Sequence, residues 1–79
     1  MEQKEVVVFS QPGCAPCVAL KSFLKQRGIE YIEKDVSQDE AAVFELVRKW
    51  KSNTTPTVVI GDEVLIGFNP ERIEQLLAK

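Results

Sequence analysis

The sequence predicts an α/β protein with the element order β-α-β-α-β-β-α, in which three helices flank a central four-stranded mixed sheet. The run Val6–Phe9 is apolar throughout, which is typical of a strand buried on both faces. A helix-like segment separates it from the next strand, so these two strands are expected to be parallel. Gly61 and Asp62 form a tight-turn signal, which indicates an antiparallel hairpin. Residues 1–79 are expected to form a single small domain.

Turn-forming residues divide the first half of the chain. The first strand is expected within Lys4–Ser10, and the break at residues 11–13 ends it. A helix is predicted from about Ala15 to Arg27, with Gly28 as its C-terminal stop. Apolar and charged residues nearly alternate over Ile29–Asp35, which predicts a second strand more exposed than the first. The apolar residues that the helix offers for packing are Val18, Leu20, Phe23 and Leu24.

The second helix is predicted from a capping box. Ser37 stands at the expected N-cap, and Glu40 follows three residues later. Arg48 and Lys49 near the helix end complement the helix dipole. Four apolar residues have the i, i+3, i+4, i+7 spacing of one buried face: Val43, Leu46, Val47 and Trp50.

The last third of the chain predicts a hairpin and a final helix. After a polar loop, Pro56 leads into the strand Thr57–Ile60, and Val64–Ile66 returns antiparallel to it. Asn69 is the expected N-cap of the last helix, with Pro70 at its first position. This helix is expected to bury Ile73, Leu76 and Leu77.

Composition excludes several classes of function. The net charge of -2 and the lack of a basic run give no sign of nucleic-acid binding. The polar start does not resemble a signal peptide, and no apolar run is long enough to span a bilayer. A CxxC motif in such a chain suggests a reducing compartment, so we expect a cytoplasmic protein.

The Cys14–Cys17 pair is the chemical centre of the sequence. A disulfide between residues three apart closes very little chain, so it stabilises the fold little and costs little to break. If Cys14 is the N-cap of the first helix, the positive helix end favours its thiolate. Pro16 has no N–H, which leaves the Cys17 N–H and thiol as the near donors. These features indicate a redox-active dithiol at a strand-to-helix junction.

Other uses of two cysteines are less well supported. Structural zinc requires four N or S ligands, and this chain has two cysteines and no histidine. A c-type haem requires histidine after the second cysteine, where Val18 stands. The alternative to a redox-active pair is two unrelated cysteines that are simply buried as small apolar residues. We therefore expect no metal and no cofactor beyond the dithiol itself.

The CxxC at this junction, Thr55-Pro56 before a later strand and a glycine turn before a capped last helix together resemble the thioredoxin superfamily. Length and element order are similar to glutaredoxin. The stretch Gly67–Glu71 resembles the Gly-Phe-x-Pro-Asp/Glu sequence of NrdH-type redoxins, which are glutaredoxin-like proteins reduced by thioredoxin reductase. The resemblance implies a thioredoxin-like (glutaredoxin) fold and thiol-disulfide oxidoreductase activity.

The resemblance also implies roles for individual residues. Cys14 corresponds to the attacking cysteine and Cys17 to the resolving one. Pro56 matches a cis-proline opposite the dithiol, which would turn the backbone of Thr55 outward toward an extended substrate. The residues expected to contact substrate are Thr55, Pro56, Gly67 and Phe68, with Pro12 and Pro16 in support. Phe68 could be either an exposed contact or part of the core.

Departures from the glutathione-binding pattern bear on the reductant. Pro16 stands where such glutaredoxins have Tyr, and Gln11 where they have Lys. Phe68 replaces a glycine beside which glutathione would lie, and Pro70 replaces an acidic residue. The expected reductant is therefore a thioredoxin-reductase-like flavoenzyme. By resemblance, the expected substrates are protein disulfides, such as those of ribonucleotide reductase or peroxide-removing enzymes. We expect the protein to be a monomer. The alternatives are a glutathione-dependent glutaredoxin and a module in which two chains share a metal or iron-sulfur cluster.

Overall fold

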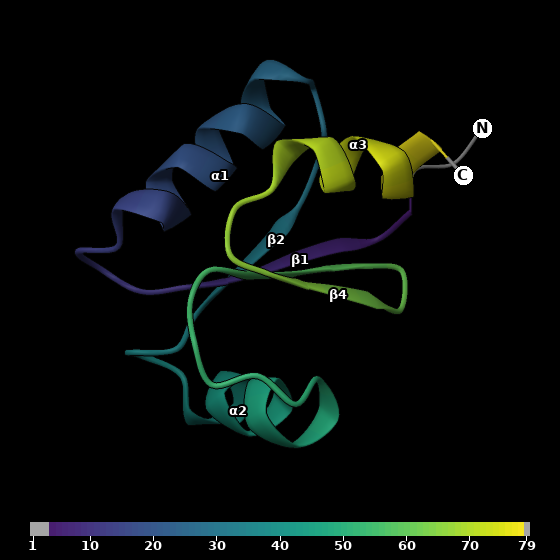
Figure 1. Ribbon diagram of the computed structural model, residues 1–79. Coiled ribbons are helices and arrows are strands. Elements are labelled where there is room, and N and C mark those ends of the chain that lie inside the picture. Colours follow the sequence, from purple (N-terminus) through teal and green to yellow (C-terminus); the bar gives the residue numbers. More distant parts are fainter. Residues whose placement is uncertain (1–3, 79) are drawn as a thin grey trace.

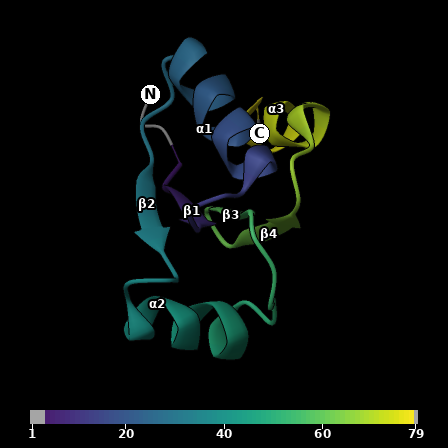
Figure 2. The same cartoon turned by 90° about the vertical axis from the view of Figure 1, so that its left-hand side faces the viewer.

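The computed structural model describes residues 4–78 and shows a sheet with helices on both faces (Figure 1). The helices α1 and α3 lie on one face and α2 lies on the other, as the view turned by 90° also shows (Figure 2). The strands are β1 (Val6–Ser10), β2 (Ile32–Asp35), β3 (Thr57–Ile60) and β4 (Glu63–Ile66). The helices are α1 (Ala15–Gln26), α2 (Glu40–Phe44), its π-helical continuation η1 (Glu45–Lys49), and α3 (Pro70–Ala78). The predicted element order is confirmed.

Strand β1 lies in the interior of the sheet, whose order is β2-β1-β3-β4. It is parallel to β2 and antiparallel to β3, and β3 is antiparallel to β4. Val8 lies between Glu33 on one side and Val58 on the other. The predicted parallel pair and the predicted hairpin are both confirmed, and all five residues of β1 are buried.

Alternate residues of the central strands supply two separate cores. On the face covered by α1 and α3, Val6 and Val8 of β1 are buried with side chains from both helices. On the face covered by α2, Val7 and Phe9 are buried with Val59. The helix side chains that complete the two cores are Leu20, Leu24, Ile73 and Leu76 on the first face and Ala42 and Leu46 on the second.

The second strand is shorter than predicted. It begins at Ile32 rather than Ile29 because the Ile29 N–H still donates to Leu24 O, at 2.9 Å, in the C-terminal turn of α1. The side chains of Ile29 and Tyr31 pack against the first core, so the chain does not pair with β1 until Ile32 faces Val7. As predicted, this strand is more exposed than β1.

The prediction that Val18 packs against the sheet is wrong, because 63% of that residue is exposed. The buried stripe of α1 is formed by Cys17, Leu20 and Leu24. Adjacent helical residues point about 100° apart, so burying Cys17 turns Val18 toward solvent. Phe23 packs at the edge of the first core, as expected.

The predicted capping box at the start of α2 is wrong. Asp39 is the N-cap, and its Oδ1 accepts from the N–H groups of Ala41 at 3.0 Å and Ala42 at 3.3 Å. Ser37 instead donates both its N–H and its hydroxyl to Asp35 Oδ1, at 2.8 and 2.6 Å. An aspartate at the end of β2 therefore competes for Ser37 and holds it in the preceding turn.

The buried face of α2 is also displaced from the prediction. Leu46 is buried and Trp50 packs against the second core as expected, but Val43 and Val47 are 40% and 45% exposed. Ala42, rather than Val43, lies against the sheet. The helix widens into η1, where the Trp50 N–H donates to Glu45 O at 3.1 Å across five residues. Val43 and Val47 are left on the surface.

The last helix follows the prediction. Asn69 caps it, since its Oδ1 accepts from the Arg72 N–H at 3.2 Å, and Pro70 is its first residue. Ile73 and Leu76 are buried, and Leu77 packs at the edge of the first core. None of the helices within residues 4–78 is long and apolar enough to cross a membrane.

A polar cluster joins α1 to the ends of β1 and β2. Lys21 Nζ and the buried Ser10 hydroxyl both donate to Glu33 Oε2, each at 2.7 Å. The hydrogen bond from Lys21, and after it that from Ser10, lowers the pKa of Glu33 below its ordinary value. The same contact with Glu33 raises the pKa of Lys21. The Lys21–Glu33 ion pair therefore holds the first half of α1 against the parallel strands β1 and β2.

We expect Glu33→Gln to lower the free energy of unfolding by at most about 1 kcal/mol at neutral pH, because solvent screens the partly exposed ion pair with Lys21. Glutamine can still accept from Ser10, so only the charge is lost. A lowered folded-state pKa means that this stabilisation is present above the ordinary carboxyl value of 4.5 and is lost as the pH falls through the folded value. Urea unfolding of both proteins should therefore show a difference that shrinks in acid. A difference that persists or grows there contradicts this assignment.

Candidate active site

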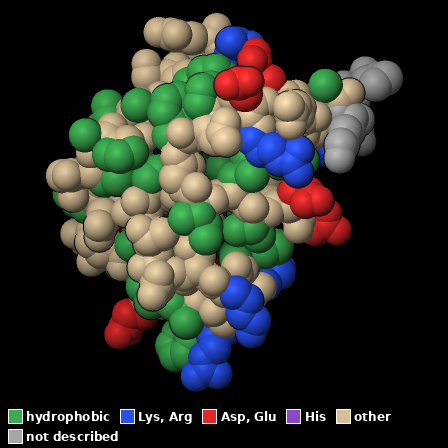
Figure 3. All heavy atoms as spheres, viewed as in Figure 1, with side chains coloured by type: hydrophobic (Ala, Val, Ile, Leu, Met, Phe, Trp, Pro, Cys, Tyr) green, Lys and Arg blue, Asp and Glu red, His purple; other side chains and the backbone are tan. Residues whose placement is uncertain are grey.

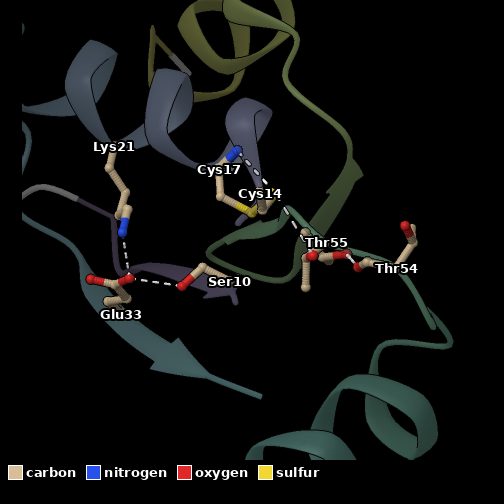
Figure 4. The surroundings of a disulfide bond; sticks show 8 residues. Ser10, Cys14, Cys17, Lys21, Glu33, Thr54 and Thr55 are labelled. Carbon is tan, nitrogen blue, oxygen red and sulfur yellow. Dashed lines mark hydrogen bonds and ion pairs between the residues drawn. A yellow bond between two sulfur atoms is a disulfide. The ribbon is translucent and has the colours of Figure 1, made fainter. Parts of the chain in front are cut away.

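The two cysteines lie at the N-terminus of α1 and form a disulfide (Figure 4). Residues 11–13 turn the chain from β1 into the helix, and Gly13 has φ of 75°, a left-handed conformation that favours glycine. Cys14 is the N-cap, as predicted, and its Sγ accepts from the Cys17 N–H at 3.2 Å. Strand β1 and α1 thus present the disulfide at the carboxyl end of the central strand, where open α/β sheets place reactive groups.

The two sulfur-bearing residues differ in their access to solvent. Cys14 is half-buried, whereas Cys17 is 1% exposed and belongs to the buried stripe of α1. The first turn of α1 contains no acidic side chain, so Cys14 meets the positive end of the helix without a competing carboxylate. The helix end and the Cys17 N–H both stabilise negative charge on the Cys14 sulfur. The more accessible sulfur, that of Cys14, is therefore also the one on which negative charge is stabilised.

The Thr55–Pro56 peptide bond is cis, as the resemblance implied. Pro56 is buried, and its carbonyl accepts from the Gly67 N–H at 2.8 Å. The Thr55 hydroxyl lies 3.9 Å from Cys14 Sγ, within reach of a weak hydrogen bond to sulfur. The loop before β3 and the loop before α3 are thereby joined beside the dithiol.

Two buried hydroxyl groups, which the sequence analysis did not single out, hold the cis-proline loop. Thr57 Oγ1 donates to Thr54 O at 2.7 Å and shares a hydrogen bond of 2.8 Å with Ser52 Oγ. Both residues are buried. The signal that could have found them is the pair of hydroxyl residues flanking the loop, since a buried hydroxyl must find a partner nearby.

The backbone of Thr55 has unused hydrogen-bonding groups. Within residues 4–78, neither its N–H nor its carbonyl has a hydrogen-bond partner. The residue is only partly buried. An extended chain lying beside Thr55 could pair with them in the manner of an added strand.

Gly67 and Phe68 lie next to the cis-proline but play different parts. Gly67 has φ of 85° and donates to Pro56, which requires the tight left-handed turn that glycine allows. The Phe68 ring is half-buried and meets Phe23 edge-on, with 5.7 Å between ring centroids. Of the two positions considered for Phe68, the structure therefore shows the half-buried one.

The remaining residues named from the sequence lie around the disulfide. Pro12 precedes it and Pro16 lies between the two cysteines, and both are exposed. Within residues 4–78 there is no cluster of three or more His, Cys, Asp or Glu side chains that could hold a metal ion. The chemistry that this arrangement supports directly is thiol-disulfide exchange at Cys14 and Cys17.

Comparisons with known proteins agree with this geometry. The family model described as Glutaredoxin matches residues 6–65. The crystal structure of the thioredoxin-like protein BC3987 has a TM-score of 0.89 and 46% identity, covering 92% of this chain and 100% of that one. NrdH-redoxin from Escherichia coli has a TM-score of 0.79 and 26% identity, covering 91% of this chain and 93% of that one.

A curated sequence relative gives the same result. A glutaredoxin-like protein of Clostridium pasteurianum, from a rubredoxin operon, is 27% identical over 74 residues, which covers 94% of this chain and 99% of the relative. The structural neighbours confirm the thioredoxin-like fold, and the family model spans most of the chain. The chain therefore belongs to the glutaredoxin family, and the CxxC pair at the head of α1 makes it a thiol-disulfide oxidoreductase.

Proposed function

We propose that this oxidoreductase reduces disulfides in other proteins and is itself reduced by a thioredoxin-reductase-type flavoenzyme rather than by glutathione. The difference in solvent access between the two cysteines indicates which of them attacks the substrate. Cys14 is accessible and faces the helix N-terminus, whereas Cys17 is buried beside it. An incoming disulfide can therefore reach Cys14 first.

The proposed cycle has two exchange steps. The Cys14 thiolate attacks a substrate disulfide, which forms a mixed disulfide and releases one substrate sulfur as thiolate. Cys17 loses its proton and attacks the Cys14 sulfur, which releases the second substrate thiolate. Two electrons pass to the substrate, and the product is the Cys14–Cys17 disulfide seen here. A reductase then returns two electrons to the pair.

Three features support a protein reductase over glutathione. Phe68 occupies a position where glutathione-binding relatives have glycine, and its ring is held by Phe23. Pro70 begins α3 where such relatives have an acidic residue. The similar E. coli protein is described as glutaredoxin-like with a thioredoxin-like activity profile. Pro12 and Pro16, both exposed beside the disulfide, support a contact rim for a partner protein.

The cellular setting is part of the same proposal. Dithiols of this kind cycle in reducing compartments, so we place the protein in the cytoplasm as a monomeric electron carrier that contributes to redox homeostasis. No metal or cluster takes part in the proposed cycle, because each step needs only the two sulfurs and the partner disulfide.

The reductant can be identified by following NADPH consumption with the oxidised protein as substrate. We expect fast turnover with thioredoxin reductase and slow turnover with glutathione plus glutathione reductase, because Phe68 and Pro70 disfavour glutathione binding. Fast turnover with glutathione alone contradicts the proposed reductant. Iron content and colour of protein purified without oxygen serve as the control for a cluster-binding module.

The roles of the two sulfurs can be separated with Cys17→Ser. We expect this variant to accumulate mixed disulfides with a disulfide-bearing protein such as insulin, because Cys14 can attack but nothing resolves the product. Cys14→Ser is the matched control and should form none. Non-reducing gel electrophoresis and mass spectrometry would detect the species. If Cys14→Ser forms the complexes and Cys17→Ser does not, the assigned roles are reversed.

A further inference from the structure

The far end of the second helix carries a cluster of basic side chains. Residues 46–61 include Arg48, Lys49 and Lys51 and no acidic residue, although the whole chain has a net charge of -2. All three side chains are exposed, and so is Phe44, with 62% of its surface accessible. We call Phe44, Arg48, Lys49 and Lys51 the η1 basic surface. In Figure 3 the lower part of the molecule, where α2 runs, shows Lys and Arg beside hydrophobic side chains.

The charges of this surface are not neutralised by ion pairs within the protein. Glu45 is the nearest acidic residue in the sequence, but its Oε1 accepts from Lys34 at 2.5 Å and its Oε2 from Trp50 Nε1 at 3.1 Å. Lys49 attracts the Glu45 carboxylate without forming an ion pair with it. Within residues 4–78, no carboxylate pairs with any of the three basic side chains of the surface. They are therefore available to the acidic groups of a second molecule.

Aromatic rings lie under two of these cations. Arg48 Cζ lies 5.7 Å from the centre of the Phe44 ring, and Lys49 Nζ lies 4.9 Å from the centre of the Trp50 ring. A guanidinium that stacks on a ring keeps the donors at its edge for a carboxylate. The exposed Phe44 ring adds apolar area beside these donors. The combination fits a segment that carries both acidic and apolar residues.

Lys51 stands in a backbone conformation that side chains rarely adopt. Its φ of 59° is left-handed, and it follows Trp50, the C-cap of η1. Helices commonly place glycine at this position, where any other side chain is strained. The turn allows the Ser52 N–H to donate to Leu46 O at 3.0 Å, which glycine would allow with less strain. The turn therefore does not account for a lysine here, whereas a role for its charge does.

The η1 basic surface lies close enough to the dithiol for one partner protein to touch both. Lys51 precedes Thr55 by four residues, so their Cα atoms lie at most about 14 Å apart. The Thr55 hydroxyl lies 3.9 Å from Cys14 Sγ, and Val47 lines the same cavity as Thr55. A protein interface of standard size covers about 800 Å² per partner, which is a patch about 30 Å across. A protein docked at Cys14 would therefore extend over the end of η1.

We propose that the η1 basic surface binds an acidic segment of the protein whose disulfide is reduced at Cys14. The inference rests on the proposed function and adds a substrate class: proteins with Asp and Glu, and an apolar side chain among them, near the attacked disulfide. Nucleic acid fits less well, because its line of phosphates would run past three cations onto the rest of the chain, which carries a net negative charge. Complementary charge of this kind speeds association and selects partners.

The test uses Gly and Ser peptides with one cysteine joined as a mixed disulfide to thionitrobenzoate. A linker of about six residues, which spans up to roughly 20 Å, leads to a tail of Glu-Glu-Leu-Glu-Glu or Gln-Gln-Leu-Gln-Gln. The Cys14 thiolate attacks the peptide sulfur, and the coloured thionitrobenzoate thiolate leaves with the electron pair. Cys17 then loses its proton, attacks Cys14 Sγ and releases the peptide thiolate. Stopped-flow absorbance gives the release rate with the reduced protein.

At about 10 mM salt we expect the Glu tail to give release about fivefold faster than the Gln tail, since each exposed ion pair is worth roughly a factor of two. At about 1 M salt the difference should vanish, because the screening length falls to about 3 Å. The triple variant Arg48→Gln, Lys49→Gln, Lys51→Gln should show no preference for the Glu tail at low salt and should keep the release rate of the Gln tail.

The matched control is the triple variant Lys25→Gln, Arg27→Gln, Arg72→Gln. These exposed side chains lie in or next to α1 and α3, on the other face of the sheet, and their loss changes the net charge by the same amount. The control should keep the fivefold preference. If it loses the preference as fully as the first variant does, net charge explains the effect and the surface assignment is wrong.

A cysteine-free peptide with the Glu tail tests the surface separately from the exchange. We expect it to shift the backbone amide NMR signals of residues 44–51, and not those of the variant that lacks the three cations. No shift there, or no preference for the Glu tail, overturns the inference, while release from the Gln-tailed peptide still supports the proposed function. If single-stranded DNA of similar length shifts these signals at lower concentration than the peptide, nucleic acid is the occupant and the inference is overturned. If neither peptide releases thionitrobenzoate and Cys17→Ser captures no insulin, the proposed function fails, and with it the assignment of the segment to a substrate.

Discussion

Strand β1 is covered on both faces and paired on both edges, and the dithiol and the cis-proline loop both lie at its carboxyl end. Val6 and Val8 pack under α1 and α3, whereas Val7 and Phe9 pack over α2. This burial fixes where the chain leaves the sheet and therefore where α1 begins. The alternation of buried side chains along β1 also places the dithiol helix α1 on one face of the sheet and α2 on the other.

The chemistry follows from the contrast between the two cysteines. An N-cap side chain must lie outside the helix, so Cys14 is accessible and receives the Cys17 N–H. Three residues later the helix has turned toward the sheet, so Cys17 joins the stripe that contains Leu20 and Leu24. A spacing of three thus brings one partly exposed sulfur and one buried sulfur within bonding distance. The cis Thr55–Pro56 bond adds an unpaired stretch of backbone next to the exposed one.

Much of the fold could be predicted from the sequence, because strong apolar periodicity and turn chemistry are local signals. The buried run of β1, the Gly61 hairpin and the Asn69-Pro70 start of α3 are of this kind. Errors arose where two local solutions competed. Asp39 and Ser37 could both cap α2, and the carboxylate of Asp35 decided the outcome by binding Ser37. Val43 and Val47 fitted a buried face, but contact with the sheet selected Ala42 and Leu46.

The site was predictable only in part. The dithiol and its N-cap position follow from the CxxC spacing, but the cis bond at Pro56 rested on family resemblance, since nothing local favours it. Contacts between distant segments, such as Thr55 with Cys14 and Glu33 with Ser10, depend on sheet topology and could not be read from the chain. The cavity lined by Gln11, Val43 and Thr55 was missed for the same reason, because its lining comes from the segments after β1 and β2, from α2 and η1, and from the loop before β3.

The central claim is that Cys14 is the accessible, attacking sulfur and Cys17 the protected one. The most direct measurement is a brief exposure of the reduced protein to limiting iodoacetamide, followed by acid quenching and peptide mass spectrometry. The account predicts that Cys14 carries most of the label and that Cys17 reacts comparably only after the chain is unfolded. Equal labelling of the two cysteines in the folded protein, or preferential labelling of Cys17, would contradict it.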